Sequence, residues 1–224
     1  MSFDFQEELI TPIGTLVGFT ALSNPQAYEN KGEPHYSCKL ALDGQDPATQ
    51  QLVETIETAI ENAQEYMNMI AAKYNKTSVS AAQARKRAPL PFEPEYDESD
   101  NPTGRIIFKF RQASTVYSSN QKVPFTLPVV DSQNQPMAQD IYSGSAASLM
   151  FLIKPWYVAS AGLGISLRPR GVQVTELVTR KAEGDSPDVT KFPVREGGYV
   201  AEAAAPITPH IPNPPVEMNG FDEL

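Results

Sequence analysis

The sequence predicts a mainly β domain with inserted helices, followed by a disordered C-terminal tail. Several runs, such as residues 35–42 and 105–111, alternate apolar and polar side chains, which is the period of a half-buried strand. Between them, from residue 46 to 87, apolar side chains recur every three or four positions, as on an amphipathic helix. We therefore expect a folded domain over residues 1–180 with a helical insertion at 46–87, and a flexible, Pro-rich acidic tail over 181–224.

The first two strands are expected at residues 9–22 and 35–42. The first run is rich in Thr, Val and Ile and contains Gly14 and Gly18. Glycine inside a strand often marks a bulge or a bend in a small barrel. In the second run every other residue from Tyr36 onward is apolar, so this strand should turn one face towards a core.

The helical insertion has a clear start. Asp46 is a candidate N-cap and Pro47 suits the first turn, so a helix of about 25 residues is expected to run to Lys73. A shorter helix is expected at residues 80–87. Residues 88–104 hold several prolines and an acidic run, and they are predicted to form an exposed loop.

Strands resume after this loop. Residues 105–111 place Arg105, Lys109 and Arg111 on one face and aromatic side chains on the other. Residues 123–130 contain two prolines and are predicted as a single strand at a sheet edge. Residues 114–122 are expected to be a polar loop.

The last strands carry the longest apolar runs. Residues 149–158 are apolar on both parities, which predicts a central strand that is buried on two sides. Residues 163–167 and 172–175 predict two strands joined by a tight turn at Arg168-Pro169-Arg170-Gly171. Short, Gly-marked strands interrupted by a helix suit a five-stranded barrel of the oligonucleotide-binding (OB) type, and a β-sandwich is the alternative.

A resemblance to a known family rests on the order of motifs between residues 139 and 178. Tyr142-Ser143-Gly144-Ser145 is followed by a long strand with an aromatic pair, then Gly164-Ile165-Ser166-Leu167-Arg168 and Gly171-Val172-Gln173-Val174. This order resembles the phage single-stranded DNA-binding proteins, which have an OB barrel and an acidic C-terminal tail. The resemblance covers Ser2 to about Leu177. It implies sequence-independent binding and protection of single-stranded DNA during phage replication and recombination.

The distribution of charge agrees with nucleic-acid binding although the net charge is −9. Residues 105–180 hold eight basic and three acidic residues, a balance of +5, whereas the last 24 residues hold four acids and no Lys or Arg. A basic body with segregated acidic segments can bind DNA even when the total charge is negative. The single cysteine, Cys38, excludes an internal disulfide and fits a reducing compartment, which the resemblance makes the host cytoplasm.

Cationic side chains are the first group of candidate DNA ligands, because Lys and Arg bind phosphates without reading sequence. A solvated strand face is the alternative explanation for such a group. The candidates lie on predicted strands and in the predicted loops beside them: Lys39, Arg105, Lys109, Arg111, Lys122, Lys154, Arg168 and Arg170. The cluster Arg85-Lys86-Arg87 could extend this surface or could simply stabilise a helix end.

Aromatic side chains are the second group, because bases of any sequence stack on exposed rings. Tyr117 lies in polar surroundings, and Tyr142, Trp156 and Tyr157 are further candidates, with burial in the core as the alternative for Trp156. Tyr36 and Phe125 are expected in the core.

Catalysis, cofactors and metal ions are not expected. One cysteine and two distant histidines cannot form an ordinary zinc site, and neither short glycine motif continues into a phosphate loop. The expected partner is single-stranded DNA, with replication proteins at the tail, no membrane, and a homo-oligomer or cooperative array on DNA. A virion structural or assembly protein and a strand-annealing recombination mediator are the alternative functions.

Overall fold

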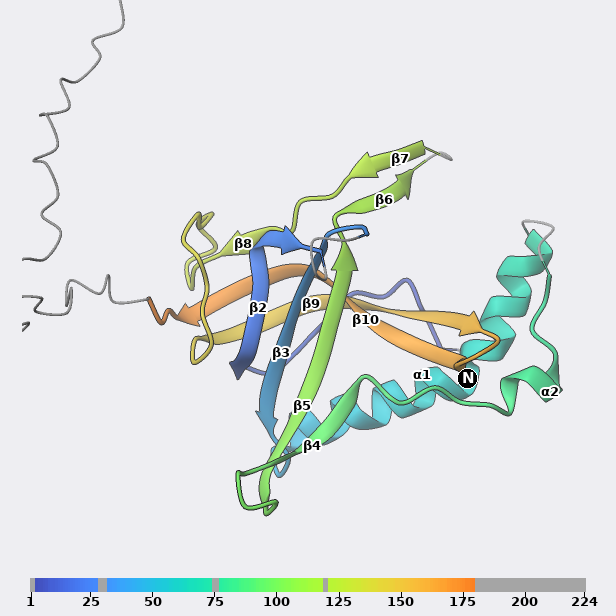
Figure 1. Ribbon diagram of the computed structural model, residues 1–224, viewed down its shortest axis with the longest axis horizontal. Coiled ribbons are helices and arrows are strands. Elements are labelled where there is room, and N and C mark those ends of the chain that lie inside the picture. Colours follow the sequence, from blue (N-terminus) through green and yellow to red (C-terminus); the bar gives the residue numbers. More distant parts are fainter. Residues whose placement is uncertain (1–2, 28–31, 74–76, 119–120, 180–224) are drawn as a thin grey trace, which may run out of the picture. The chain divides into compact units, whose positions relative to one another are not determined.

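Five long strands close into a ring in the computed structural model, which describes residues 3–27, 32–73, 77–118 and 121–179 (Figure 1). The ring strands are β2 (Gly14–Gln26), β3 (His35–Asp43), β5 (Pro102–Ala113), β9 (Ala146–Val158) and β10 (Gly162–Glu176). They pair in the order β9-β2-β3-β5-β10, and the long β9–β10 pairing completes the circle. All pairs in the ring are antiparallel except β5 with β10, which is parallel. The predicted mainly β, five-stranded barrel is confirmed.

Short strands extend this ring. These short strands are β1 (Leu9–Ile10), β4 (Phe92–Tyr96), β6 (Thr115–Ser118), β7 (Gln121–Pro124) and β8 (Val129–Val130). β1 pairs with β9, β8 with β10 and β4 with β5. β6 and β7 pair only with each other, in a hairpin that projects from the barrel in Figure 1.

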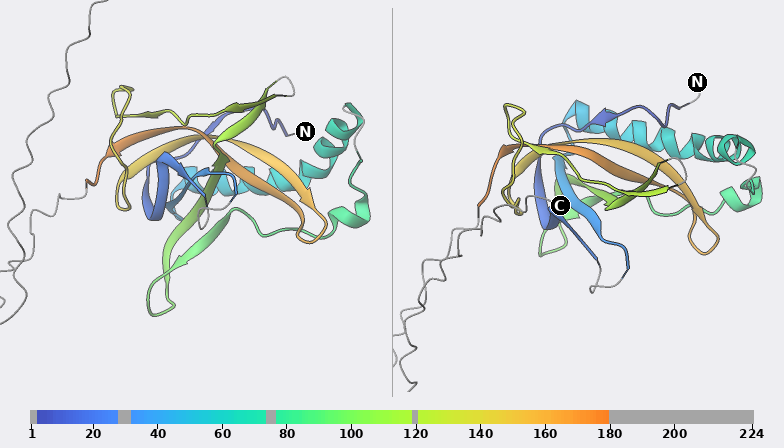
Figure 2. Two further views of the ribbon diagram at one scale, coloured as in Figure 1. Left: turned by 45° about the horizontal axis from the view of Figure 1, so that its top comes forward. Right: turned by 90° about the horizontal axis from the view of Figure 1, so that it is seen from above.

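One long helix covers the β9–β10 ribbon. α1 (Pro47–Lys73) confirms the predicted helix, and the Asp46 carboxylate accepts a hydrogen bond from the Ala48 N–H at 3.2 Å, as an N-cap does. The helix runs along the ribbon in Figure 2. Its buried stripe includes Ile56, Ala59 and Ala63, which join the same core cluster as the ribbon side chains. α2 (Ala81–Ala84) is much shorter than the predicted helix at residues 80–87.

The barrel interior is built from alternate residues of each strand. Phe108 and Phe110 of β5 are fully buried, and the Phe110 ring meets Phe151 of β9 edge-on at 5.3 Å. Tyr36 and Cys38 on β3 are buried in the same cluster, as their alternation predicts. Burial of each such large apolar side chain stabilises the fold by about 1.5–3 kcal/mol. Because these residues must point into the core, the residues that alternate with them point outward.

The predicted turn at Arg168–Gly171 is wrong. β10 is one continuous strand from Gly162 to Glu176, with a register shift between Pro169 and Gly171 against β9. Pro169 has no N–H to give to a ladder, and a bulge leaves one residue unpaired while the strand continues with a bend. The two arginines therefore lie in the middle of a barrel strand and not in a mobile loop.

The exposed loop predicted at residues 88–104 is also wrong, because its middle part is β4. Phe92 packs on Phe108 with ring centroids 5.6 Å apart, and Pro94 stands opposite Ile106 on β5. An edge strand tolerates proline because one side of its backbone needs no partner. Tertiary packing has thus decided a segment whose local composition favours a loop.

Three smaller expectations also differ from the structure. The single strand predicted at 123–130 is divided into β7 and β8, and the polar loop at 114–122 is the β6–β7 hairpin. The predicted strand at 9–22 is divided into β1 and β2 on either side of Pro12. Residues 149–158 are buried mainly on alternate positions, so β9 has one core face and one outer face. The predicted tail, 181–224, lies outside the described residues.

Candidate nucleic-acid interface

The outer faces of β3 and β5 bring three predicted cations together. The antiparallel register places Lys39 directly opposite Lys109, and Ser37 opposite Arg111. Side chains directly opposite each other on a sheet lie about 4.5–5.5 Å apart at Cβ. Lys39 and Lys109 therefore lie side by side on the outer face, and their long side chains can place two positive charges against one bound anion.

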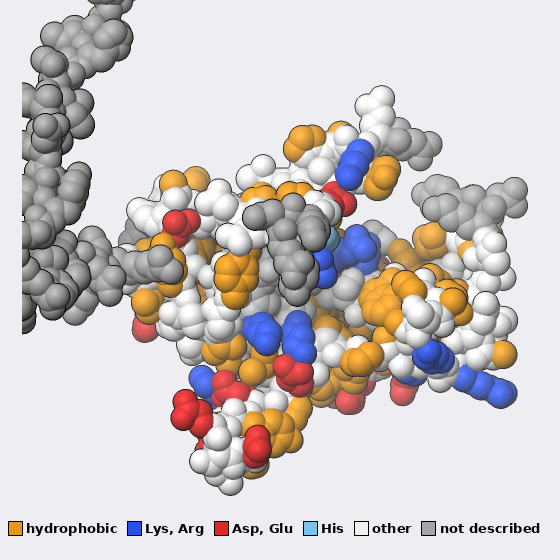
Figure 3. Space-filling model, in the orientation of Figure 1, with side chains coloured by type: hydrophobic (Ala, Val, Ile, Leu, Met, Phe, Trp, Pro, Cys, Tyr) orange, Lys and Arg blue, Asp and Glu red, His pale blue; other side chains and the backbone are white. Residues whose placement is uncertain are grey.

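β10 continues the same surface on the other side of β5. Leu167 is the Cα partner of Phe110, and both point into the core. One residue further along these parallel strands, Arg168 and Arg111 are therefore neighbours on the outer face. Figure 3 shows Lys and Arg side chains gathered over β3 and β5, at the centre of the view.

The surface ends on β9. Ser166 of β10 pairs with Lys154, whose ammonium donates to the Phe5 carbonyl at 3.2 Å and to Gln6 Oε1 at 3.3 Å. Burial, and then repulsion from Arg168 and Arg170, lowers the pKa of Lys154. Lys154 therefore lies within electrostatic reach of the two arginines of β10. We call Lys39, Lys109, Arg111, Arg168 and Lys154 the cationic band.

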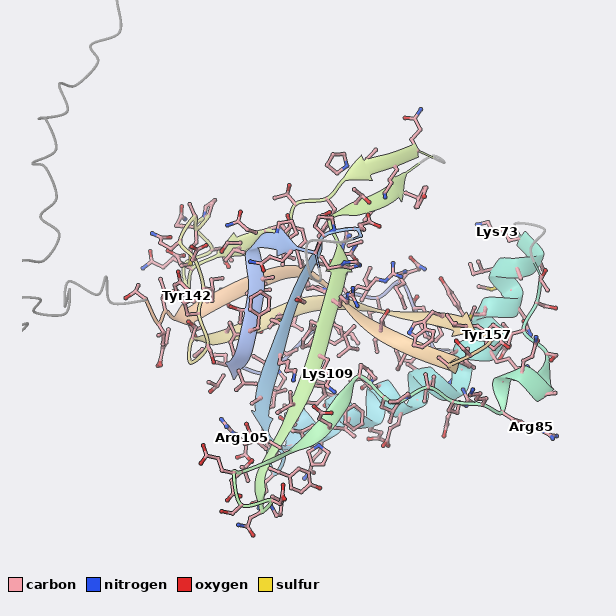
Figure 4. All side chains as sticks on the ribbon, in the orientation of Figure 1. Lys73, Arg85, Arg105, Lys109, Tyr142 and Tyr157 are labelled. Carbon is pink, nitrogen blue, oxygen red and sulfur yellow. The ribbon has the colours of Figure 1, made fainter. Side chains whose placement is uncertain are left out.

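Arg105 lies at one end of β5 and has a different environment. Its guanidinium holds both oxygens of Glu95 on β4, with N–O distances of 2.6 and 2.8 Å. Glu95 is only 14% exposed, and hydrogen bonds from Arg105 and Thr103 lower its pKa. Arg105 is therefore committed to holding β4 on β5, and Figure 4 shows it well away from Lys109 along the strand.

Lys109 has a looser partner. Its ammonium contacts Glu93 of β4 at 2.5 Å, but both side chains are more than two-fifths exposed. Exposed ion pairs contribute little to stability, typically about 0–1 kcal/mol. A phosphate can therefore replace this carboxylate without loss of the fold.

His35 and Arg111 are in contact at the end of the band. The guanidinium of Arg111 lies 3.3 Å from His35 Nδ1, which accepts this hydrogen bond in the neutral ring. Burial, followed by repulsion from Arg111, lowers the pKa of His35, and the nearby Glu33 acts in the opposite direction.

The β6–β7 hairpin carries the remaining exposed pair of candidates. Tyr117 is 78% exposed and stands opposite Lys122 across the hairpin. The Lys122 ammonium lies 3.2 Å from Glu33, in the loop before β3. The Phe125 N–H donates to the Ser114 carbonyl at 2.8 Å and anchors the base of the hairpin. Tyr117 is thus an unburied ring on a projection that starts at the end of β5.

Trp156 and Tyr157 have opposite orientations on the β9–β10 ribbon. The Trp156 indole, which shares the parity of Lys154, lies so close to its cross-strand partner Gly164 that a Cβ there would be 2.5 Å from the ring. Gly164 therefore makes room for the indole. Tyr157 packs against the hydrophobic core, near α1 in Figure 4, and is not on the band's face.

Other basic candidates have structural partners. Arg170 lies 3.6 Å from Glu8, with its guanidinium 5.3 Å from the centre of the Phe125 ring. The Lys86 ammonium donates to the Ser160 carbonyl, and Arg87 donates to the Ile60 carbonyl at 2.7 Å. These contacts hold the 85–87 segment to α1 and to the end of the ribbon, which favours the structural explanation of that cluster.

Tyr142 is separate from the band. It lies beyond β2 from β3 and β5 in Figure 4, and it lines a hollow together with β2 residues from Gly18 to Gln26. The sequence analysis missed one residue of that hollow, Phe19, which is 64% exposed although it belongs to a barrel strand. The predicted strand at 9–22 contained it, and its parity with Val17 already points it outward. The hollow also needs residues 140–143 and 178–179, which are distant in sequence, so alternation within one strand does not reveal it.

The sequence of this chain matches a known family over most of the barrel. A family profile described as the single-stranded DNA-binding protein of bacteriophage T7 matches residues 13–177. The chain belongs to this family. Membership of this family supports single-stranded DNA binding, the function that the sequence analysis favoured over a virion structural role.

Two solved structures of phage single-stranded DNA-binding proteins are similar to this chain in fold. The crystal structure of gp2.5, a single-stranded DNA-binding protein encoded by bacteriophage T7, is similar with a TM-score of 0.61 and 20% identity, over 80% of this chain and 96% of that chain. The single-stranded DNA-binding protein from bacteriophage Enc34, in complex with single-stranded DNA, has a TM-score of 0.52 and 15% identity, over 77% and 88% of the two chains. No curated protein sequence matches this chain significantly.

Two further observations concern the part of the chain that the structure describes. Within it, no helix is long and apolar enough to cross a membrane. In the same residues, no three His, Cys, Asp or Glu side chains gather as they would around a metal ion.

Proposed function

We propose that single-stranded DNA crosses the outer face of β3, β5 and β10 along the cationic band. Lys39, Lys109, Arg111 and Arg168 bind successive phosphates, and the backbone contacts require no particular sequence. Tyr117 and Lys122 on the hairpin, and Trp156 beside Gly164, flank this path and supply stacking surfaces and further charge.

The observation that supports this path best is the strand register. Lys39 stands opposite Lys109, and the β5–β10 pairing makes Arg111 and Arg168 neighbours. Charges from three strands that are far apart in sequence thus form one continuous surface. A solvated strand face needs no such alignment across strands, whereas a polyanion that runs over the barrel does.

The double variant Lys109→Gln/Arg111→Gln tests the path. It removes two phosphate contacts, so affinity for oligo(dT) should fall by at least about tenfold, and the slope of log K against log salt should become shallower by roughly 1.4. Fluorescence anisotropy at several salt concentrations measures both quantities. Arg85→Gln is the matched control, because Arg85, the C-cap of α2, lies far from Lys109 in Figure 4. An unchanged salt slope in the double variant would contradict the path.

The same proposal covers the role of the protein in the infected cell. The chain coats and protects exposed strands during phage replication and recombination in the host cytoplasm, without catalysis and without a cofactor. Because it prefers unpaired DNA, mass action melts hairpins. Neighbouring molecules on one strand form a cooperative array, and the acidic tail docks replication proteins.

A further inference from the structure

The β2 strand contains an irregular segment next to the cationic band. Val17 pairs with Lys39 and Ala21 pairs with Ser37, so three β2 residues, Gly18, Phe19 and Thr20, stand against one residue of β3. Gly18 has a φ of +66°, a left-handed conformation that glycine adopts without strain. Phe19 shares the parity of Val17, the partner of the outward-facing Lys39, and 64% of the residue is exposed.

The exposed ring borders a hollow of about 510 Å³. One wall is the irregular half of β2, and the other is the segment from Asp140 to Ser143 with Val178 and Thr179. The Thr20 hydroxyl donates to the Ile141 carbonyl at 2.6 Å and holds the two walls together. A volume in the range of roughly 300–1,000 Å³ suits a small planar group.

The charges of the lining decide which part of a nucleotide fits. None of the described lining residues is Lys or Arg, and Asp140 contributes a carboxylate. That carboxylate repels a phosphate but accepts hydrogen bonds from the N–H groups of bases. Among the described residues, Lys39 of the band pairs with Val17, which is two residues from Phe19. The hollow therefore suits a base whose own backbone phosphate stays on Lys39.

We propose that Phe19 and this hollow form a nucleobase subsite at the β2 end of the cationic band. A base stacks on the Phe19 ring and turns its polar edge towards the side chains of Ser23, Asn24 and Asp140. Figure 3 shows hydrophobic side chains over β2 directly beside the cations over β3 and β5. This subsite rests on the proposed function, because the band must hold the strand for a base to reach the ring.

The test compares a normal strand with one that has no bases. Phe19→Ala should bind oligo(dT) roughly 5- to 150-fold more weakly, which is the range for one stacked base, and should bind an abasic deoxyribose-phosphate oligomer of equal length as the parent protein does. Phe19→Trp should keep the affinity for oligo(dT). Gly18→Ala has free space around its new methyl group, so it changes only the backbone conformation that presents Phe19 and should act like Phe19→Ala.

Met69→Ala is the matched control, because Met69 is another exposed hydrophobic residue, on α1. A 5-iodouracil oligonucleotide should photo-crosslink to a peptide that contains Phe19. If Phe19→Ala lost affinity equally for oligo(dT) and for the abasic oligomer, or lost none for either, the subsite would be overturned. Salt-dependent binding by the parent protein would still support the cationic band in that case. A change in oligomeric state in Phe19→Ala would instead assign the ring to a contact between protein copies. Absence of binding by the parent protein would remove the proposed function itself.

Discussion

We expect His35 to make DNA binding at the proposed cationic band depend on pH. Burial and the neighbouring Arg111 keep the pKa of His35 below its ordinary value, so the ring is neutral near pH 7. A DNA phosphate on Arg111 compensates the repulsion and favours the protonated ring. Binding therefore takes up a proton, and affinity for oligo(dT) should rise as the pH falls from about 7 to about 5.

His35→Gln tests this coupling, because it keeps a polar side chain but does not titrate. Its affinity should vary less with pH than that of the parent protein in anisotropy titrations at fixed salt. His210→Gln is the matched control, since His210 is the only other histidine in the sequence. Identical pH profiles for His35→Gln and the parent protein would show that His35 does not sense the bound strand.

Single residues also show where sequence reasoning reached the site. The parity of residues 35–42 and 105–111 was enough to place Lys39, Lys109 and Arg111 outward, because one face of each strand must enter the core. Phe19 was missed although its parity with Val17 points it outward, because parity does not show that an outward ring borders a hollow built partly from a distant segment.

The strand β4 supplies carboxylates to the same surface that we propose for phosphates. The Glu93 carboxylate forms an ion pair with the Lys109 ammonium, and both side chains are largely exposed. A DNA phosphate must therefore displace this carboxylate before it can contact Lys109. Glu93→Gln removes the competitor and should strengthen oligo(dT) binding at low salt by roughly 2- to 5-fold, the equivalent of one exposed ion pair.

Glu95→Gln is the informative comparison. Glu95 is mostly buried against Arg105, so its loss should weaken the attachment of β4 and lower the melting temperature rather than raise affinity. Anisotropy and thermal unfolding on both variants separate the two roles. If Glu93→Gln binds DNA no better than the parent protein, the exchange of carboxylate for phosphate at Lys109 is refuted.

Local pattern predicted β3, α1 and the central part of β5, residues 105–111, well, because each has a strong period. It was wrong for β4 and for the centre of β10, and both segments contain proline. Proline argues against a strand only where a backbone N–H is needed. At an edge or a bulge that need is absent, and neither is visible before the neighbouring strands are known.

Beyond the barrel, the acidic C-terminal residues 217–224 are proposed to compete for the cationic band. A tethered anion acts at a local concentration on the order of millimolar, and three acids in this segment make the competition weak. Deleting residues 217–224 should therefore raise affinity for oligo(dT) modestly, by about 2- to 5-fold at low salt, with a smaller effect as salt screens the charges.

The matched control deletes residues 206–213, which has the same length and contains no Asp or Glu. Equal affinity for the parent protein and the 217–224 deletion across the salt series would eliminate this competition. A similar gain in both deletions would mean that tail length matters and the acidic charge does not.

The continuity of the whole surface is what sequence could not provide. Within one strand, spacing gives the face of each cation, but the adjacency of Arg111 and Arg168 depends on the pairing of Phe110 with Leu167. That pairing joins residues distant in the chain and follows from closure of the barrel, not from any local preference.

The late position of β10 also has a consequence for how the protein folds. Until β10 docks, β5 and β9 both present unpaired backbone, and such open edges recruit other chains. Parallel pairing between distant segments is intrinsically slow. Refolding from denaturant should therefore pass through an aggregation-prone intermediate in which β10 is not yet paired with β5 and β9. The yield of refolded protein should fall as protein concentration increases.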